Sequence, residues 1–185
     1  MFIKIFKVNF SRCLAICCFL FSGNALIASS QVEAFRHWKE FESSNEWHVK
    51  LPSYPKHLHQ VIEVPGGESL AYDIYLSTLD RHAAYIILSA DATPFLNQSH
   101  GHKGLENILN HLMNQKKGKL ISARLIEEDR DQGMDFFIDY QGIYFRGRVW
   151  LTPKKVYLLG MESNESHYPY EAFDHFVNSF KRLAH

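Results

Sequence analysis

A two-residue turn between two alternating segments constrains the fold of this chain more than any other feature. Gln141-Gly142 separates Met134–Tyr140 from Ile143–Leu151. In both segments most of the alternate positions are occupied by apolar residues. Side chains alternate between the two faces of a strand, and a two-residue connection containing glycine favours an antiparallel hairpin. The pattern therefore predicts a hairpin in which Tyr140 lies opposite Ile143 and one face is apolar.

The second face of this hairpin carries two arginines among aromatic residues. Counting outward from the turn places Phe137 opposite Arg146 and Asp135 opposite Arg148. In one interpretation, carboxylates of the same sheet neutralise the arginines, since cross-strand pairs contribute about 0.2–1 kcal/mol each. In the other, the strand forms a partner-binding face, because arginine and aromatic residues are enriched at contact surfaces. The residues of that predicted binding face are Tyr144, Arg146, Arg148 and Trp150.

Further segments with a strand or helix pattern surround the hairpin. Strands are predicted at Trp47–Leu51, His57–Val64, Leu70–Leu76, Ala83–Ala90, Leu120–Ile126 and Val156–Met161. Apolar residues at helical spacing predict one helix that contains Leu105–Met113 and a second over Tyr170–Leu183. Residues 32–43 are interpreted as a short helix or as a loosely held arm. Because short turns join most neighbouring strands, the pattern predicts an α+β fold with a largely antiparallel sheet flanked by helices.

Three stretches of the sequence form a recognisable set. An early strand ends in LPSYP, a later block reads GMDFFIDYQGIYFRGRVWLTPKKVYLLGMES, and the last predicted helix contains FDHFVNSFKRL. Over roughly residues 46–183 this set resembles the PsbP-like superfamily. The resemblance implies an α-β-α sandwich. It also implies that no shared active-site residues can be carried over, since the known members mostly bind partners and a fold alone does not determine function.

The first 28 residues have the order of a secretory signal. A basic start at Lys4, Lys7 and Arg12 is followed by the apolar run Cys13–Phe21 and then by small residues at positions 25–30. We expect cleavage after Ala28 or, as the second choice, after Ser30. The alternative is an uncleaved anchor, although the apolar run is shorter than the about 20 residues that span a bilayer.

The composition of the processed chain excludes several classes of protein. All three cysteines lie in the leader, so the processed chain has neither a disulfide nor a catalytic thiol. Loss of three of the 20 basic residues leaves 17 against 20 acidic ones, a net charge near −3. A nucleic-acid-binding protein would show a basic excess instead. We expect residues 29–45 to form the arm or short helix and residues 46–185 to form one domain, which has no stable membrane span after cleavage.

Histidines provide the main alternative to a binding role. His100 and His102 lie in a polar segment, and two imidazoles can share a metal ion, but a firm zinc site needs three or four ligands. No third ligand follows from spacing, so no metal or other cofactor is expected. His57 and His59 are interpreted as ordinary strand residues.

Sequence motifs of catalysis are missing as well. The chain has no Gly-x-Ser-x-Gly elbow, no His-Glu-x-x-His motif and no phosphate-binding loop. The sequence therefore favours a non-catalytic binding or assembly protein of the cell envelope, exported to the periplasm or secreted, with a protein partner. A histidine-based metal-binding or metal-dependent hydrolytic protein is the alternative.

Overall fold

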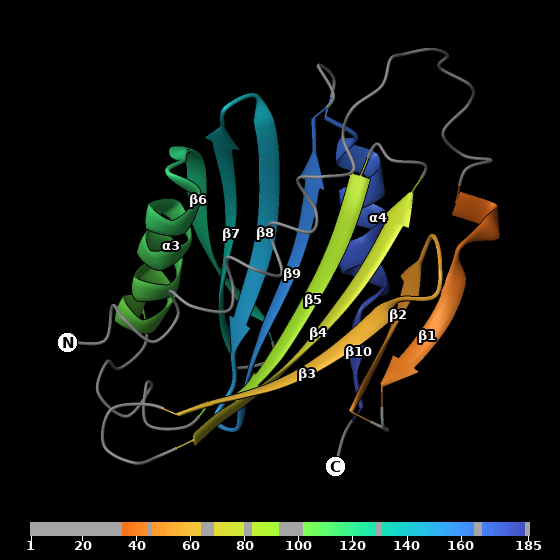
Figure 1. Ribbon diagram of the computed structural model, residues 1–185, viewed down its shortest axis with the longest axis horizontal. Helices are drawn as coiled ribbons and strands as arrows, with labels where there is room; N and C mark the ends of the chain where they lie inside the picture. The colour runs from red at the N-terminus through yellow and green to blue at the C-terminus, as the bar shows by residue number, and fades with distance from the viewer. Residues whose placement is uncertain are drawn as a thin grey trace.

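The computed structural model describes residues 35–43, 46–63, 69–79, 83–92, 102–128, 131–164 and 168–183 (Figure 1). The predicted secretory signal and its cleavage positions lie outside these ranges. The elements in chain order are the 3-10 helix η2 (Phe35–His37), β1 (Lys39–Ser43), β2 (Trp47–Leu51), β3 (Lys56–Glu63), β4 (Ser69–Leu79), β5 (Ala83–Asp91), α3 (His102–Lys116), β6 (Lys119–Glu128), β7 (Asp131–Tyr140), β8 (Ile143–Leu151), β9 (Lys155–Ser163), α4 (Tyr170–Ser179) and β10 (Lys181–Arg182).

The strands form two antiparallel sheets. The larger has seven strands in the order β3-β4-β5-β9-β8-β7-β6, and the smaller has three in the order β1-β2-β10. Every pairing in both sheets is antiparallel, which confirms the sheet predicted from the short turns. The strand β5 lies inside the larger sheet, and all residues of Ala83–Ala90 are buried.

Two apolar cores lie on opposite faces of the larger sheet. On one face α3 packs against β6 and β7 and contributes Leu105 to a core that includes Phe136. On the other face α4 and the smaller sheet form the second core, in which Trp47 and Phe173 are fully buried. Figure 1 shows the two helices at separate positions along the sheet, with α4 beside β9 and β5 and α3 beside β6. The predicted arrangement of helices on an antiparallel sheet is therefore confirmed.

The β7–β8 hairpin has the register that the sequence predicts. Tyr140 lies opposite Ile143, Phe137 opposite Arg146 and Asp135 opposite Arg148. Gln141 and Gly142 both have positive φ angles, 57° and 80°, which is the backbone of the turn that best matches strand twist.

Two glycines let aromatic rings lie flat on the sheet in the α3-side core. The ring of Phe136 covers Gly147 and the ring of Phe145 covers Gly160, so that an added Cβ would meet ring carbons at 2.3 and 2.6 Å. Any side chain at these positions would displace a fully buried phenylalanine.

The segment around residues 32–43 differs from the helix that its aromatic spacing suggested. In the described part of this segment, Phe35–His37 forms one helical turn, and Lys39–Ser43 is a strand that pairs with β2. Trp38 is buried beside Tyr85, and Phe41 packs against Trp47. The aromatic residues are therefore spaced to reach one core from a strand, and pairing with β2 outweighs the weak local preference for a helix.

The last helix is shorter than predicted. It ends at Ser179, and Phe180 has an extended backbone with φ −71° and ψ 124°. Lys181 and Arg182 then pair with His48 and Trp47 as β10. This change of direction places the ring of Phe180 between Trp47 and Trp150, with ring centroids 5.6 Å away on each side.

Candidate functional site

The α4 side of β7 and β8 is an aromatic part of the larger sheet that is only partly covered. From Met134 to Tyr140 of β7 the residues on the α3 side are buried, whereas those on the α4 side are only half-buried. The reason is that α4 packs mainly against β2 and β9 and contacts β7 through the ring of Tyr170 at its first turn. We call this surface the open face and define it by Phe137, Tyr144, Arg146 and Tyr170.

Aromatic rings form the body of the open face. The ring of Phe137 lies 5.7 Å from that of Tyr144 and 5.9 Å from that of Tyr170, which is 50% exposed. Beneath them Tyr168 is buried and donates its hydroxyl hydrogen to the carbonyl oxygen of Met161 at 3.0 Å. Burial raises the pKa of Tyr168, so this residue stays neutral and serves as an anchor. The rings above it are thus held on a fixed base.

The first interpretation predicted that carboxylates of the same sheet neutralise Arg146. Instead, a residue of helix α4 does so. Nη1 of Arg146 lies 3.1 Å from Oδ1 of Asp174 on α4, and the guanidinium centre lies 4.5 Å from the ring of Phe173. Asp139 accepts a hydrogen bond from the backbone N–H of Gly142. The Nη1 atom has no hydrogen bond of acceptable geometry, so the contact with Asp174 is an ion pair only.

Arg148 is neutralised within the sheet as the register predicts. Its Nε and Nη2 donate to the two carboxylate oxygens of Asp135 at 2.5 and 2.9 Å. Arg124 on β6 approaches the same carboxylate at 3.3 Å. Two-point contact between guanidinium and carboxylate fixes both groups, so Arg148 is a structural residue at the border of the open face.

Trp150 does not belong to a surface. It is 4% exposed and stacks on Phe180, with an interplanar angle of 17°. The alternating pattern correctly predicts the face of β8 on which Trp150 lies, but β10 and the end of α4 cover that part of the sheet. Of the predicted binding residues, Tyr144 and Arg146 lie on the open face, Arg148 borders it and Trp150 is core.

Of the two weak metal-binding candidates, His100 and His102, the structure describes one. His102 is exposed at the start of α3, and His100 lies outside the described residues. Within the described ranges no group of three or more histidine, cysteine or acidic side chains is arranged to hold a metal ion.

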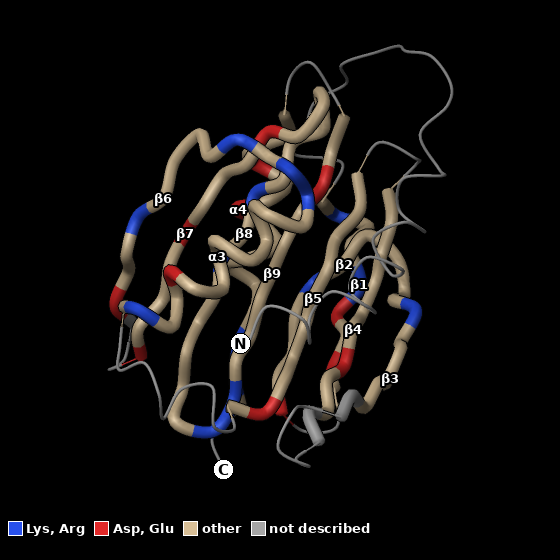
Figure 2. Tube along the Cα trace, turned by 60° about the vertical axis from the view of Figure 1, so that its left-hand side comes forward, with Lys and Arg blue, Asp and Glu red and all other residues tan. Residues whose placement is uncertain are grey.

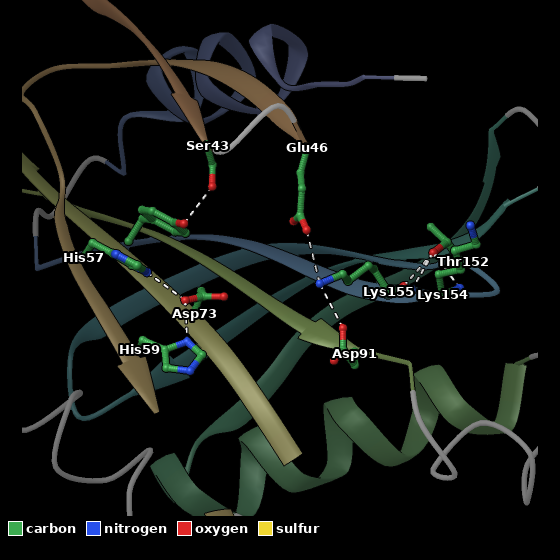
Figure 3. Close-up of polar contacts among 10 residues, drawn as sticks. Ser43, Glu46, His57, His59, Asp73, Asp91, Thr152, Lys154 and Lys155 are labelled. Carbon is green, nitrogen blue, oxygen red and sulfur yellow. Dashed lines mark hydrogen bonds and ion pairs between the residues drawn. The ribbon is translucent and has the colours of Figure 1, made fainter. Parts of the chain in front are cut away.

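Two other histidines, His57 and His59 on β3, share a carboxylate on β4. His57 Nε2 and His59 Nδ1 lie 2.7 and 2.9 Å from the same carboxylate oxygen of Asp73 (Figure 3). Partial burial alone would raise the pKa of Asp73, but the hydrogen bonds from His59 and His57 outweigh burial and hold it below its usual value of 3.8. The ring of His57 also stacks on Tyr75 at 4.4 Å. Period-two spacing on a strand was the available signal for this cluster.

One functional-looking group was missed entirely by sequence reasoning. Lys116 at the end of α3 enters the α3-side core and places Nζ 2.9 Å from Oε2 of Glu162 on β9. The rings of Tyr140 and Phe145 lie 3.9 and 4.7 Å from the same Nζ. The two charged side chains are 2% and 0% exposed, so no ligand reaches this pair in the described structure, and it fastens α3 to the sheet.

A further polar contact ties the smaller sheet to the larger one. Lys155 on β9 lies 3.3 Å from Glu46, before β2, and 2.9 Å from Asp91 (Figure 3). Burial lowers the pKa of Lys155, but the two carboxylates outweigh that effect and raise it overall. The ammonium group therefore stays charged and holds the two sheets together.

No helix within the described ranges is long and apolar enough to cross a membrane. No known protein family matches the sequence, and no curated protein does. The structure is similar to the solution structure of cyanobacterial PsbP (CyanoP) from Synechocystis sp. PCC 6803, with a TM-score of 0.56, 11% identity and coverage of 85% of this chain and 98% of that chain.

A crystal structure from Bacteroides thetaiotaomicron VPI-5482 aligns with a TM-score of 0.44 and 13% identity, over 80% of this chain and 49% of that one. That score is too low to support an argument. Identity near one residue in ten limits the cyanobacterial likeness to the fold. The chain thus has a PsbP-like fold, an antiparallel sheet with helices packed on it.

Proposed function

We propose that this protein is an exported, non-catalytic binding or assembly protein of the cell envelope, which holds a protein partner on the open face. The observation that carries the proposal is the partly exposed aromatic surface of Phe137, Tyr144 and Tyr170 beside Arg146. Aromatic residues and arginine are the residue types that contribute most to binding between proteins. Export is supported by the leader pattern and by the absence of cysteine after residue 18.

The chemistry of the open face supports binding over catalysis. Arg148 is engaged by Asp135, and Arg146 by Asp174, so positive and negative charges are matched in pairs. A general acid or base needs a titratable group that is placed to exchange a proton with a substrate. Groups already held in ion pairs are better suited to fixing the shape of a contact surface than to proton transfer.

The alternative function based on histidine and metal has less support. The one histidine cluster in the described part of the chain has both imidazoles directed at a single carboxylate oxygen of Asp73. Metal-bound carboxylates and imidazoles present their free lone pairs to the ion instead. The described residues therefore support a binding function better than a metal-dependent one.

Site-specific crosslinking tests the proposal with a control inside the same chain. Tyr170 and Tyr54 are both exposed tyrosines, at 50% and 68%, but only Tyr170 belongs to the open face. Each is replaced in turn by a photo-reactive phenylalanine analogue in the native host. We expect a discrete adduct from position 170 that weakens when Arg146→Ala is added, and none from position 54. Equal adducts from both positions, or none from position 170, would overturn the proposal.

A further inference from the structure

We propose that His175 is an acid-sensitive latch for the N-terminal end of the domain. In its neutral form His175 holds η2 against α4, and its protonation releases η2. The latch is independent of the proposed function, because it uses neither the open face nor a partner. Its basis is an imidazole ring that is packed between aromatic rings and has one buried nitrogen without a hydrogen bond in the described part of the chain.

Aromatic contacts with α4 hold η2 in place. The ring of Phe35 lies parallel to that of His175, with centroids 4.7 Å apart and an interplanar angle of 9°. Trp38 meets both rings edge-on, at 5.4 Å from Phe35 and 5.1 Å from His175. The three residues of η2 include no buried residue, and so short a helix has little stability of its own. The stack on His175 therefore decides whether η2 stays docked.

The chain after η2 is fixed without help from His175. Trp38 is buried beside Tyr85, and Lys39–Ser43 pairs with β2. Release of the latch therefore moves Phe35–His37 and leaves β1 in the smaller sheet. Because the moving part is partly exposed already, its release uncovers little apolar surface.

The position of His175 suits a neutral ring better than a charged one. Its Nε2 atom is buried and has no hydrogen-bond partner among the described residues. In a neutral imidazole one nitrogen carries no hydrogen, whereas in the charged ring both nitrogens are donors. A charged donor without an acceptor is costly when buried. The ring of Phe35 offers a cation–π attraction, but it also excludes water from that face of the imidazole.

The charges around the ring do not compensate this cost. The charged and titratable residues on the neighbouring elements (Figure 2) are Arg36 and His37 on η2, Lys39 on β1, His48 and Lys50 on β2, and Glu171 and Asp174 on α4. Asp174 is engaged by Arg146, and Glu171 is exposed to water, which screens its charge. Burial and, to a lesser degree, Lys50 lower the pKa of His175 below its usual 6.5.

Acid therefore favours the released state. When Phe35 leaves, water reaches the uncovered face of the imidazole and the pKa of His175 rises toward 6.5. A proton that binds more tightly to the released state shifts the equilibrium toward that state. Docking of η2 is thus fully favoured above the pKa of the released form and weakens as the pH falls below it. In an exported protein the latch responds to the pH outside the cytoplasm.

A spin label on η2 measures the release in the processed protein. The processed chain has no cysteine, so His37→Cys gives a single attachment point for a nitroxide. His37 is exposed, and its replacement also removes the other histidine of η2. The mobile fraction of the EPR spectrum should rise about twofold or more from pH 7.5 to 5.0, because a difference of one unit in the pKa of His175 between the two states changes their ratio about tenfold. The same label on Asn114→Cys, an exposed position on α3, should show no change.

Two further substitutions link the movement to His175. His175→Phe keeps a ring in the stack but takes up no proton, so the label on His37→Cys should stay immobile at both pH values. Phe35→Ala should leave the label mobile throughout, and NMR titration of this variant should show the pKa of His175 shifted upward toward 6.5. Circular dichroism confirms that each variant is folded. The proposal is overturned by a label whose mobility does not change with pH, by an equal change in His175→Phe, or by a pKa of His175 that is the same with and without Phe35.

Discussion

Glu162→Gln should destabilise the fold by about 3 kcal/mol, although the two side chains have nearly the same shape. Lys116 Nζ and Glu162 Oε2 are 2.9 Å apart, and the side chains are 2% and 0% exposed. At an effective dielectric constant of ~20, unit charges at this separation attract by roughly 6 kcal/mol, which the cost of desolvating both groups offsets in part. The substitution removes the attraction and leaves an ammonium group buried.

The surroundings of Lys116 favour the lower end of the expected range. Removing one partner of a buried pair typically costs about 3–5 kcal/mol. The rings of Tyr140 and Phe145 still face the ammonium group in the variant and retain a cation–π attraction. Lys116→Met should cost at least as much as Glu162→Gln, because it leaves a fully buried carboxylate without a cation.

Urea unfolding measures the effect through tryptophan fluorescence. The midpoint should fall at an unchanged slope, and the melting temperature should drop by about 6–12 °C for a domain of this size. Arg124→Gln is the control, since Arg124 is 75% exposed in its ion pair and should contribute less than about 1 kcal/mol.

The double variant Lys116→Met/Glu162→Gln should be more stable than either single variant, because no unpaired charge remains. Additive costs, or a loss below about 1 kcal/mol for Glu162→Gln, would show that water or another cation neutralises this pair.

Other consequences can be measured on the same protein. A double-mutant cycle of Asp135→Asn and Arg148→Gln should give a coupling of about 1 kcal/mol, since the two-point contact is half-buried; additivity would contradict it. Burial and, to a lesser degree, the charge of Lys50 lower the pKa of His175 from its usual 6.5. At and below that pH the unfolded chain therefore binds more protons than the folded chain. The free energy of unfolding should fall as the pH is lowered from about 7.5 to 5.5, and it should fall less in His175→Phe. A strong chelator should leave the melting temperature unchanged, as no ligand set of three is found in the described residues; a large drop would revive a metal function. The intact mass of exported material should match a chain that begins at Ser29, and the mass of the full-length chain would show an uncleaved leader.

Local sequence patterns predicted most of the fold, because their interpretation does not depend on residues that are distant in the sequence. The register of the β7–β8 hairpin follows from a two-residue turn and from alternation, and the structure reproduces it pair by pair. Strands β2 and β8 have the predicted bounds for the same reason. Helix α4 begins at Tyr170 as its apolar spacing predicts, but its end depends on β10, whose pairing partner lies far away in the sequence.

The candidate site was harder to predict because it depends on what covers each strand. Alternation places Trp150 and Arg146 on one side of β8, but it cannot tell that Phe180 lies over the first and Asp174 beside the second. The buried pair of Lys116 and Glu162 is invisible for a related reason. A single charged residue at a core position looks like a surface residue until its partner is known, and this partner is on another element.

The pairing of β10 with β2 has a consequence for how the molecule acquires its fold. Residues 181–182 complete a sheet that begins near residue 47, and Phe180 closes over Trp47 and Trp150. Contacts this distant in sequence form late and slowly. If the chain is exported N-terminus first, as proposed above, its tryptophan-rich core stays incomplete until almost all of the domain has crossed the membrane. Slow closure of this kind keeps a chain unfolded during translocation. It also leaves aromatic surface exposed to aggregation for the same interval, when a chaperone is most needed.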